Sequence, residues 1–206
     1  MHVLIASSNK GKLRDFAAVA SLHGVTVELI PDFNTLPLAV EDGATFQENA
    51  RKKAEHYSRY VPGELVMADD SGLAVDALHG APGVWSARYA AGDHPGEPLD
   101  DANNRKVLLE MEGVPDEKRT ARFVCVIAVA RDGQTLATFE GKAEGVLLYE
   151  LRGTGGFGYD PMFYFQELRK TFAELSATEK AAVSHRGQAF TKFLEWCDQR
   201  AAGDAR

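Results

Sequence analysis

The chain has 206 residues, 45% of them hydrophobic, which is enough for one sizeable core, so we expect residues 1–206 to form a single, two-lobed domain. A formal net charge of -7 and a pI near 5.4 exclude binding of nucleic acid or anionic membranes through a generally basic surface. Any phosphate-binding site must therefore be local.

Apolar periodicity and turn residues predict the elements in chain order. In the first half we expect strands over 2–7, 25–30 and 64–69. Helices are expected between them, over 13–20 and 45–57. The second of these helices begins with a capping box of Thr45 and Glu48. In the second half we expect a loop over 80–98, a helix over 100–113 and a long antiparallel ribbon over 119–149. Short helices follow over 171–183, and a final helix ends in a frayed tail at about 200–206.

Cysteine content and hydropathy indicate a cytoplasmic protein. Cys125 and Cys197 have neither the spacing of metal ligands nor the density of a disulfide scaffold. The apolar run near the N-terminus is too short for a signal peptide, and no other run is long enough to span a membrane. We therefore expect a soluble protein with no nucleic-acid or membrane partner.

The first candidate functional segment is "SSNKGK" (7–12), between the first strand and the first helix. Loop N–H groups and a helix N-terminus attract an anion, and Lys10 and Lys12 add positive charge. The spacing of a Walker loop is absent, and an ordinary strand-to-helix turn with solvated lysines accounts for the same residues.

The helix "FQENARKKA" carries Lys53, which could reach a phosphate at the ends of the strands, although a solvated helix face is the simpler interpretation. Glu41 and Asp42, just before this helix, indicate by themselves only an acidic turn.

The third strand is predicted to end at two adjacent carboxylates, Asp69 and Asp70. Because side chains alternate along a strand, these two point to opposite sides, and only one need face a cleft. One or two carboxylates together with substrate phosphates commonly hold Mg²⁺. An Asx turn before Gly72 would account for the pair without a metal.

Two later segments contain candidate nucleotide contacts. "GTGGFGYDP" provides flexible backbone with Phe157 and Tyr159 as possible stacking surfaces, although a tight loop with Phe157 in the core is equally consistent. "SHRG" places His185 and Arg186 in the first turn of a helix, where the dipole disfavours cations and an anionic or polar ligand is favoured.

Taken in order, "SSNKGK", "FQENARKKA", "ADDSGLAVDALHGAPGVWSARYA", "GGFGYDPMF" and "SHRGQA" resemble the inosine/xanthosine triphosphate pyrophosphatases, from about residue 3 to about residue 195. The resemblance implies a two-lobed α/β fold with a long central mixed β-sheet flanked by helices and an active-site cleft between the lobes. It also implies a homodimer and Mg²⁺-dependent hydrolysis of ITP, dITP and XTP to the monophosphate and pyrophosphate.

The resemblance also assigns roles to residues. It makes Glu41 and Asp70 the metal ligands and Asp70 the general base. It places substrate contacts on Ser7, Ser8, Asn9, Lys10, Gly11, Lys12, Lys53, Ser71, Phe157, Gly158, Tyr159, Asp160, Lys180, His185 and Arg186. The residues up to Lys53 contact the triphosphate, and those from Phe157 onward contact the base and sugar. Ser7 stands where threonine is more usual and keeps the hydroxyl.

Two other functions stay open. A related pyrophosphatase that acts on pyrimidine or modified nucleotides would have the same fold, although "SHRG" after "GYDP" is of the purine type. A nucleotide-binding module without turnover would not need Glu41, Lys53 and Asp70 together.

Overall fold

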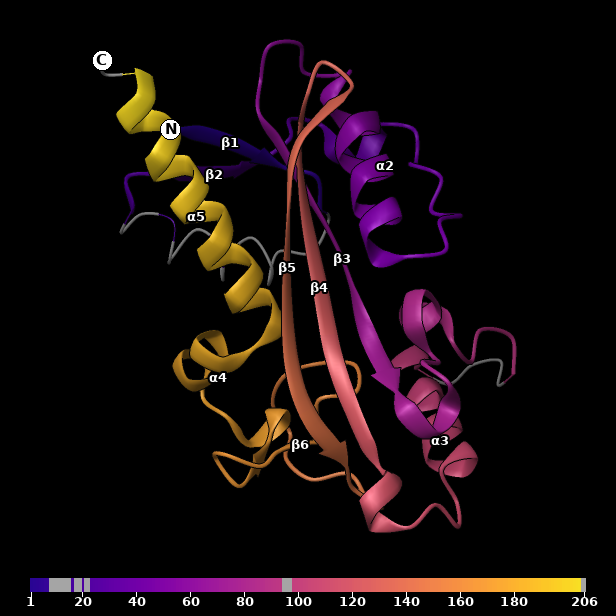
Figure 1. Ribbon diagram of the computed structural model, residues 1–206. Helices are drawn as coiled ribbons and strands as arrows, with labels where there is room; N and C mark the ends of the chain where they lie inside the picture. The colour runs from indigo at the N-terminus through magenta and orange to yellow at the C-terminus, as the bar shows by residue number, and fades with distance from the viewer. Residues whose placement is uncertain (8–15, 17–19, 21–22, 94–97, 205–206) are drawn as a thin grey trace. The chain divides into compact units, whose positions relative to one another are not determined.

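Figure 1 shows the protein as a computed structural model, which describes residues 1–7, 16, 20, 23–93 and 98–204. Its helices are α2 (Phe46–Ser58), α3 (Leu99–Glu110), α4 (Ala177–Val183) and α5 (His185–Asp204). Its strands are β1 (His2–Ile5), β2 (Thr26–Leu29), β3 (Val66–Val75), β4 (Thr120–Arg131), β5 (Gln134–Leu147), β6 (Phe163–Phe165) and β7 (Lys170–Thr171). Of the helix predicted over 13–20, only Phe16 and Ala20 are described, and both are helical.

The strands form one mixed sheet of seven strands in the order β2-β1-β3-β4-β5-β6-β7. β1 pairs in parallel with β2 and β3, whereas β6 pairs antiparallel with β5 and β7. A two-residue turn joins β4 to β5, and its residues Asp132 and Gly133 have φ values of 51° and 79°, as a tight hairpin requires. The predicted α/β class, mixed sheet and long ribbon are therefore confirmed.

The chain divides into two compact units. Unit 1 comprises Met1–Asp70, Cys125–Gly141 and Arg186–Arg206, and unit 2 comprises Ser71–Val124 and Lys142–His185. In unit 1, β-strand residues such as Met67 and Ile127 pack in one core with an apolar face of α5, formed by Phe190, Phe193, Leu194 and Cys197. In unit 2, aromatic residues dominate the core, and the Phe123 ring lies 4.7 Å from that of Phe163 and 5.6 Å from that of Phe172.

β3 is longer than predicted. It continues past the two carboxylates to Val75, so the expected end at Asp69 and the alternative of a turn before Gly72 are both wrong. Gly72 lies against a 3-10 helix, and an added Cβ there would overlap Ser86 Oγ and lie 2.7 Å from Gly83 O. Ser86 Oγ also accepts a hydrogen bond from Leu73 N at 2.9 Å. The contact with Ser86 thus accounts for the continuation of β3 past the polar residues 69–71.

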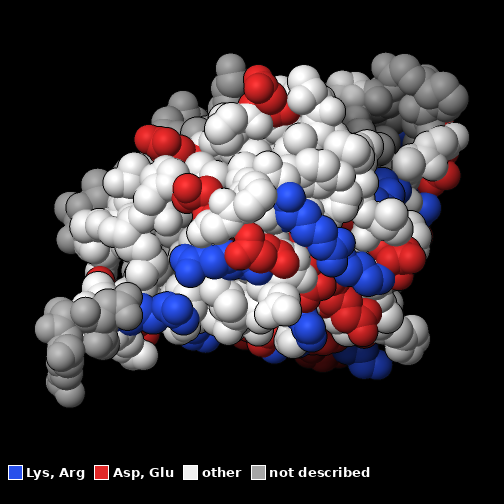
Figure 2. Space-filling view, turned by 90° about the horizontal axis from the view of Figure 1, so that it is seen from above, with Lys and Arg blue, Asp and Glu red and all other residues white. Residues whose placement is uncertain are grey.

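One face of the described surface carries charges of both signs (Figure 2). On the face shown in Figure 2, basic side chains lie beside acidic ones, and the described residues form no continuous basic surface there. None of the helices in the described part of the chain combines the length and hydropathy that crossing a membrane requires.

Candidate active site

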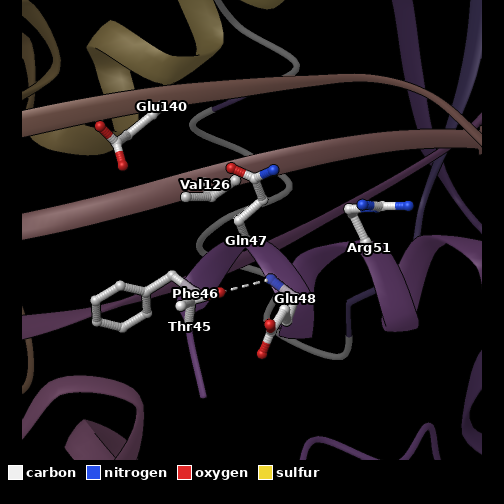
Figure 3. A pocket seen from close by; sticks show the side chains of 7 residues that line it. All are labelled: Thr45, Phe46, Gln47, Glu48, Arg51, Val126 and Glu140. Atoms are coloured by element: carbon white, nitrogen blue, oxygen red, sulfur yellow. Dashed lines mark hydrogen bonds between the residues drawn. The ribbon is translucent and has the colours of Figure 1, made fainter. Parts of the chain in front are cut away.

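Helix α2 begins after Thr45, as the capping box predicted. Thr45 Oγ1 accepts a hydrogen bond from Glu48 N at 3.1 Å, which is the dashed line in Figure 3. The second half of the box differs from the prediction, since Glu48 Oε2 accepts from Ala44 N at 2.7 Å, one residue before the cap. The cap fixes the first turn of α2, from which Asn49 and Lys53 follow one helical turn apart.

In unit 1, Lys53 lies between two of the predicted carboxylates. Its Nζ is 2.9 Å from Glu41 Oε2 and 3.2 Å from Asp70 Oδ1. The side chains of Lys53 and Asp70 are only 14% and 13% exposed. The structure therefore brings the three predicted residues into one partly buried cluster.

Burial and charge have opposing effects in this cluster. Burial raises the pKa of Asp70, and the Lys53 ammonium and a hydrogen bond from Asn49 only partly counter it, so the pKa stays above its usual value. For Lys53, burial alone would lower the pKa, but the neighbouring carboxylates outweigh it and raise that pKa; they are Asp70, Asp69 and Glu41. Lys53 is therefore held as a cation beside a carboxylate of increased basicity.

The second oxygen of Asp70 indicates where a metal would bind. Asp70 Oδ2 is buried, and no described residue donates a hydrogen bond to it. Such an oxygen in a native fold calls for a ligand or a water, and a carboxylate is a good ligand for a hard cation. The described residues contain no group of three or more His, Cys, Asp or Glu that could hold a metal alone. The residues present therefore fit a hard divalent cation that would take waters and substrate phosphates as further ligands.

Asn49 belongs to the cluster although it was absent from the predicted site. It is almost fully buried, and its Oδ1 accepts a hydrogen bond from Gly43 N at 2.8 Å. A Cβ at Gly43 would lie 2.7 Å from Asn49 Oδ1, so only glycine allows this close approach. Asn49 thereby ties the segment that carries Glu41 to α2. Its spacing of four residues from Lys53 places it beside that lysine on α2, but this spacing gives no sign of the contact with Gly43.

Asp69 lies beside a different cation from the one that pairs with Asp70. Its Oδ2 lies 3.9 Å from Arg186 Nε, and both side chains are buried. Asp69 and Asp70 point to opposite sides of β3, as the alternation of a strand predicts. Arg186, predicted to contact the base and sugar, is placed in unit 1 beside Asp69.

The predicted phosphate loop is only partly described. Ala6 N donates to Met67 O at 2.8 Å, so the chain leaves β1 near the level at which β3 reaches Asp69 and Asp70. Ser7 is half-buried at this point. The remaining predicted phosphate contacts, Ser8, Asn9, Lys10, Gly11 and Lys12, lie outside the described residues.

In unit 2, three predicted substrate residues form a second group. Buried Asp160 accepts hydrogen bonds through Oδ2 from Lys180 Nζ and from Phe157 N, the latter at 2.9 Å. The Lys180 ammonium lies 5.0 Å from the centre of the Phe157 ring, which is 50% exposed. The alternative that Phe157 belongs to the core is wrong, and its ring is accessible for stacking.

Two other predicted residues of unit 2 are packed inside it. The Tyr159 side chain is buried and donates from its hydroxyl to Ser86 O at 2.7 Å, and burial raises the pKa of that hydroxyl. The His185 ring is buried and stacks on Phe123 at 4.8 Å. Substrate contacts by these two residues, and by Ser71 on β3, stay predictions.

A pocket of about 440 Å³ lies beside the first turns of α2 (Figure 3). It is lined by Thr45, Phe46, Gln47, Glu48, Arg51, Val126 and Glu140. None of these is a predicted site residue, so this pocket is separate from the Lys53 cluster.

A strand carboxylate with one oxygen that has no donor among the described residues, beside a second carboxylate and a helix lysine, is the kind of site found in metal-assisted hydrolases of phosphate compounds. The chain belongs to the Ham1 family, which it matches over residues 3–196. The resemblance predicted from the motifs is therefore confirmed.

Individual relatives are similar over nearly their whole length. A protein named dITP/XTP pyrophosphatase from Desulforamulus reducens is 51% identical, with 95% of this chain and 94% of the relative covered. One of the same name from Geobacillus kaustophilus is 49% identical, with 99% and 98% covered. The solved structure of the Staphylococcus aureus Ham1 protein has a TM-score of 0.84 at 36% identity, with 97% of this chain and 100% of that chain covered.

Proposed function

We propose that this protein hydrolyses the non-standard purine nucleotides dITP, ITP and XTP to the nucleoside monophosphate and pyrophosphate. The observation that carries the proposal is the buried Oδ2 of Asp70, for which the described residues supply no donor, beside Lys53 and Glu41. Relatives named dITP/XTP pyrophosphatases support the substrate class.

Asp70 is the general base of the proposed reaction. Its increased basicity suits it to take a proton from an attacking water, and the Lys53 ammonium at 3.2 Å favours the ionised form that can do so. Lys53 remains protonated because of the surrounding carboxylates, so it can also contact a phosphate oxygen.

Glu41 and Asp70 are the proposed ligands of Mg²⁺. When bound there, the metal would neutralise charge on the phosphates and on the pyrophosphate leaving group. Asn49 and Gly43 keep the Glu41 segment on α2, so the two carboxylates are held in place before any ligand binds.

Two groups of residues supply the substrate contacts in this proposal. We assign the triphosphate to residues 7–12 and Lys53, and the base to the half-exposed ring of Phe157 and to donors that include Lys180. Donors suit the 6-oxo group of hypoxanthine and xanthine and leave the 6-amino group of adenine without a partner, which disfavours ATP by up to about 10⁴-fold. Gly158, Tyr159, Asp160, His185, Arg186 and Ser71 complete the proposed contacts.

Hydrolysis of ITP in ¹⁸O-labelled water tests the proposal. If the triphosphate and the base are both held, water attacks the α-phosphorus between them. We expect the label in IMP and none in the pyrophosphate. Release of IDP with labelled phosphate, or hydrolysis of ATP as fast as ITP, would contradict the proposal, and no hydrolysis of any triphosphate would favour a binding module.

We further propose that the active form is a homodimer in the cytoplasm. Sedimentation of the purified protein at micromolar concentration tests the dimer, and a mass of about 22 kDa in solution would reject it, because that is the mass of one chain.

A further inference from the structure

Two side chains of α3 bind the backbone of Gly158, the residue that follows Phe157. Asp100 Oδ2 accepts a hydrogen bond from Gly158 N at 2.8 Å, and Asn104 Nδ2 donates one to Gly158 O at 3.0 Å. Asp100 and Asn104 are four residues apart, so they lie on one face of the helix. The backbone N–H and C=O of Gly158 are therefore both hydrogen-bonded to the same helix, α3.

Gly158 needs such support because glycine is conformationally permissive. Its φ is +59°, in the left-handed region, and glycine can leave this conformation at little cost. On the other side of the turn, Phe157 N donates to Asp160 Oδ2 at 2.9 Å. The two α3 bonds and the Asp160 bond together fix the backbone on both sides of the Phe157 side chain.

Asn104 has an unusual environment for a purely structural residue. It is 3% exposed, and its Oδ1 is buried without a donor from any described residue. A buried acceptor without a partner destabilises a fold, and a leucine of similar size would avoid that loss. What leucine cannot provide is the donor to Gly158 O.

We propose that Asp100 and Asn104 are positioning residues for base recognition, which hold the Phe157–Gly158 turn so that the Phe157 ring stays where the purine stacks. The inference rests on the proposed function, in which Phe157 contacts the base. The two residues act through the turn and not at the reacting phosphorus. Their loss therefore weakens ground-state and transition-state binding alike, which raises KM and leaves kcat unchanged.

The test compares Asn104→Leu and Asp100→Ala with the wild-type protein on ITP. We expect KM to rise about tenfold for Asn104→Leu and about threefold for Asp100→Ala, whose hydrogen bond is exposed, with kcat within about twofold. Inorganic tripolyphosphate has no base, so its inhibition constant should not change. Asp100→Asn keeps an acceptor and should restore the wild-type KM.

Asp101→Ala is the matched control, since Asp101 is the exposed neighbour of Asp100 in the same first turn of α3. A KM within twofold of the wild type for both test variants would overturn the proposal. So would equal increases in KM and in the tripolyphosphate inhibition constant, which would indicate a general loss of structure. If Asn104→Leu does not fold, Asp100→Ala decides the matter. A wild-type protein that hydrolyses no ITP would instead reject the proposed function, and this inference with it.

Discussion

Replacing Asp70 by asparagine should separate stability from catalysis. At the observed 3.2 Å, the attraction between Asp70 and Lys53 is about 5 kcal/mol for an effective dielectric constant of about 20. The raised pKa of Asp70 nevertheless shows that burial opposes its charged form more than Lys53 favours it. Asp70→Asn removes both the attraction to Lys53 and the cost of burying the charge, and it keeps the shape of the side chain. We therefore expect a free energy of unfolding within about 1 kcal/mol of the wild type.

The same substitution should abolish catalysis. Asparagine cannot accept the proton and binds Mg²⁺ poorly, so kcat for ITP should fall at least about 10³-fold. Pyrophosphate release at saturating Mg²⁺ measures kcat, and urea denaturation without metal measures stability.

Lys53→Met is the matched perturbation because it removes the cation and leaves the carboxylates. Uncompensated charge in a buried pair costs about 3–5 kcal/mol, and the partial exposure of Lys53 reduces our expectation to about 2–3 kcal/mol. If Asp70→Asn destabilises the protein more than Lys53→Met does, the electrostatic reasoning is wrong. If Asp69→Asn lowers kcat as much as Asp70→Asn, the assignment of the base is wrong.

Three further predictions concern other parts of the structure. Tyr57 Oη accepts a hydrogen bond from Ala39 N at 3.3 Å, in the segment that carries the proposed metal ligand Glu41. Tyr57→Phe should therefore weaken Mn²⁺ binding about threefold, as measured by calorimetry, with little change in melting temperature. Gly72→Ala should cost about 1–3 kcal/mol in urea denaturation, because the added methyl group overlaps Ser86 Oγ. Burial raises the pKa of Cys197 to about 11, so iodoacetamide at pH 8 should modify this thiol only after denaturation. Mass spectrometry of the native and the denatured protein measures the modification.

Local patterns accounted for most of the fold. The apolar face of α5 recurs at helical spacing, and Thr45 begins α2, because both features depend on residues a few positions apart. The end of β3 was missed for the opposite reason. Asp69, Asp70 and Gly72 have low strand propensity, and only the contact with Ser86, further along the chain, shows why the strand continues.

The site shows the same division. Lys53 and Asp70 were found in their motifs and Glu41 through the family resemblance, and the structure brings the three together. Asn49 lies in one of those motifs, but its role depends on Gly43 closing against it, which spacing alone does not show. The phosphate contacts predicted for residues 7–12 remain predictions, and those beyond Ser7 lie outside the described residues.

The two adjacent carboxylates explain how an acidic protein could bind the triphosphate of the proposed function. Each has its own cation from a different helix, Lys53 of α2 for Asp70 and Arg186 of α5 for Asp69, and Glu41 adds a third carboxylate. Three carboxylates and two cations give a formal local charge of -1, which attracts a divalent cation. If Mg²⁺ binds there as proposed, the same site would carry +1, and this positive charge would attract phosphate although the chain as a whole is at -7. Triphosphate binding should therefore depend on prior metal binding, and calorimetry that detects equally tight binding of a nonhydrolysable ITP analogue with and without Mg²⁺ would contradict this account.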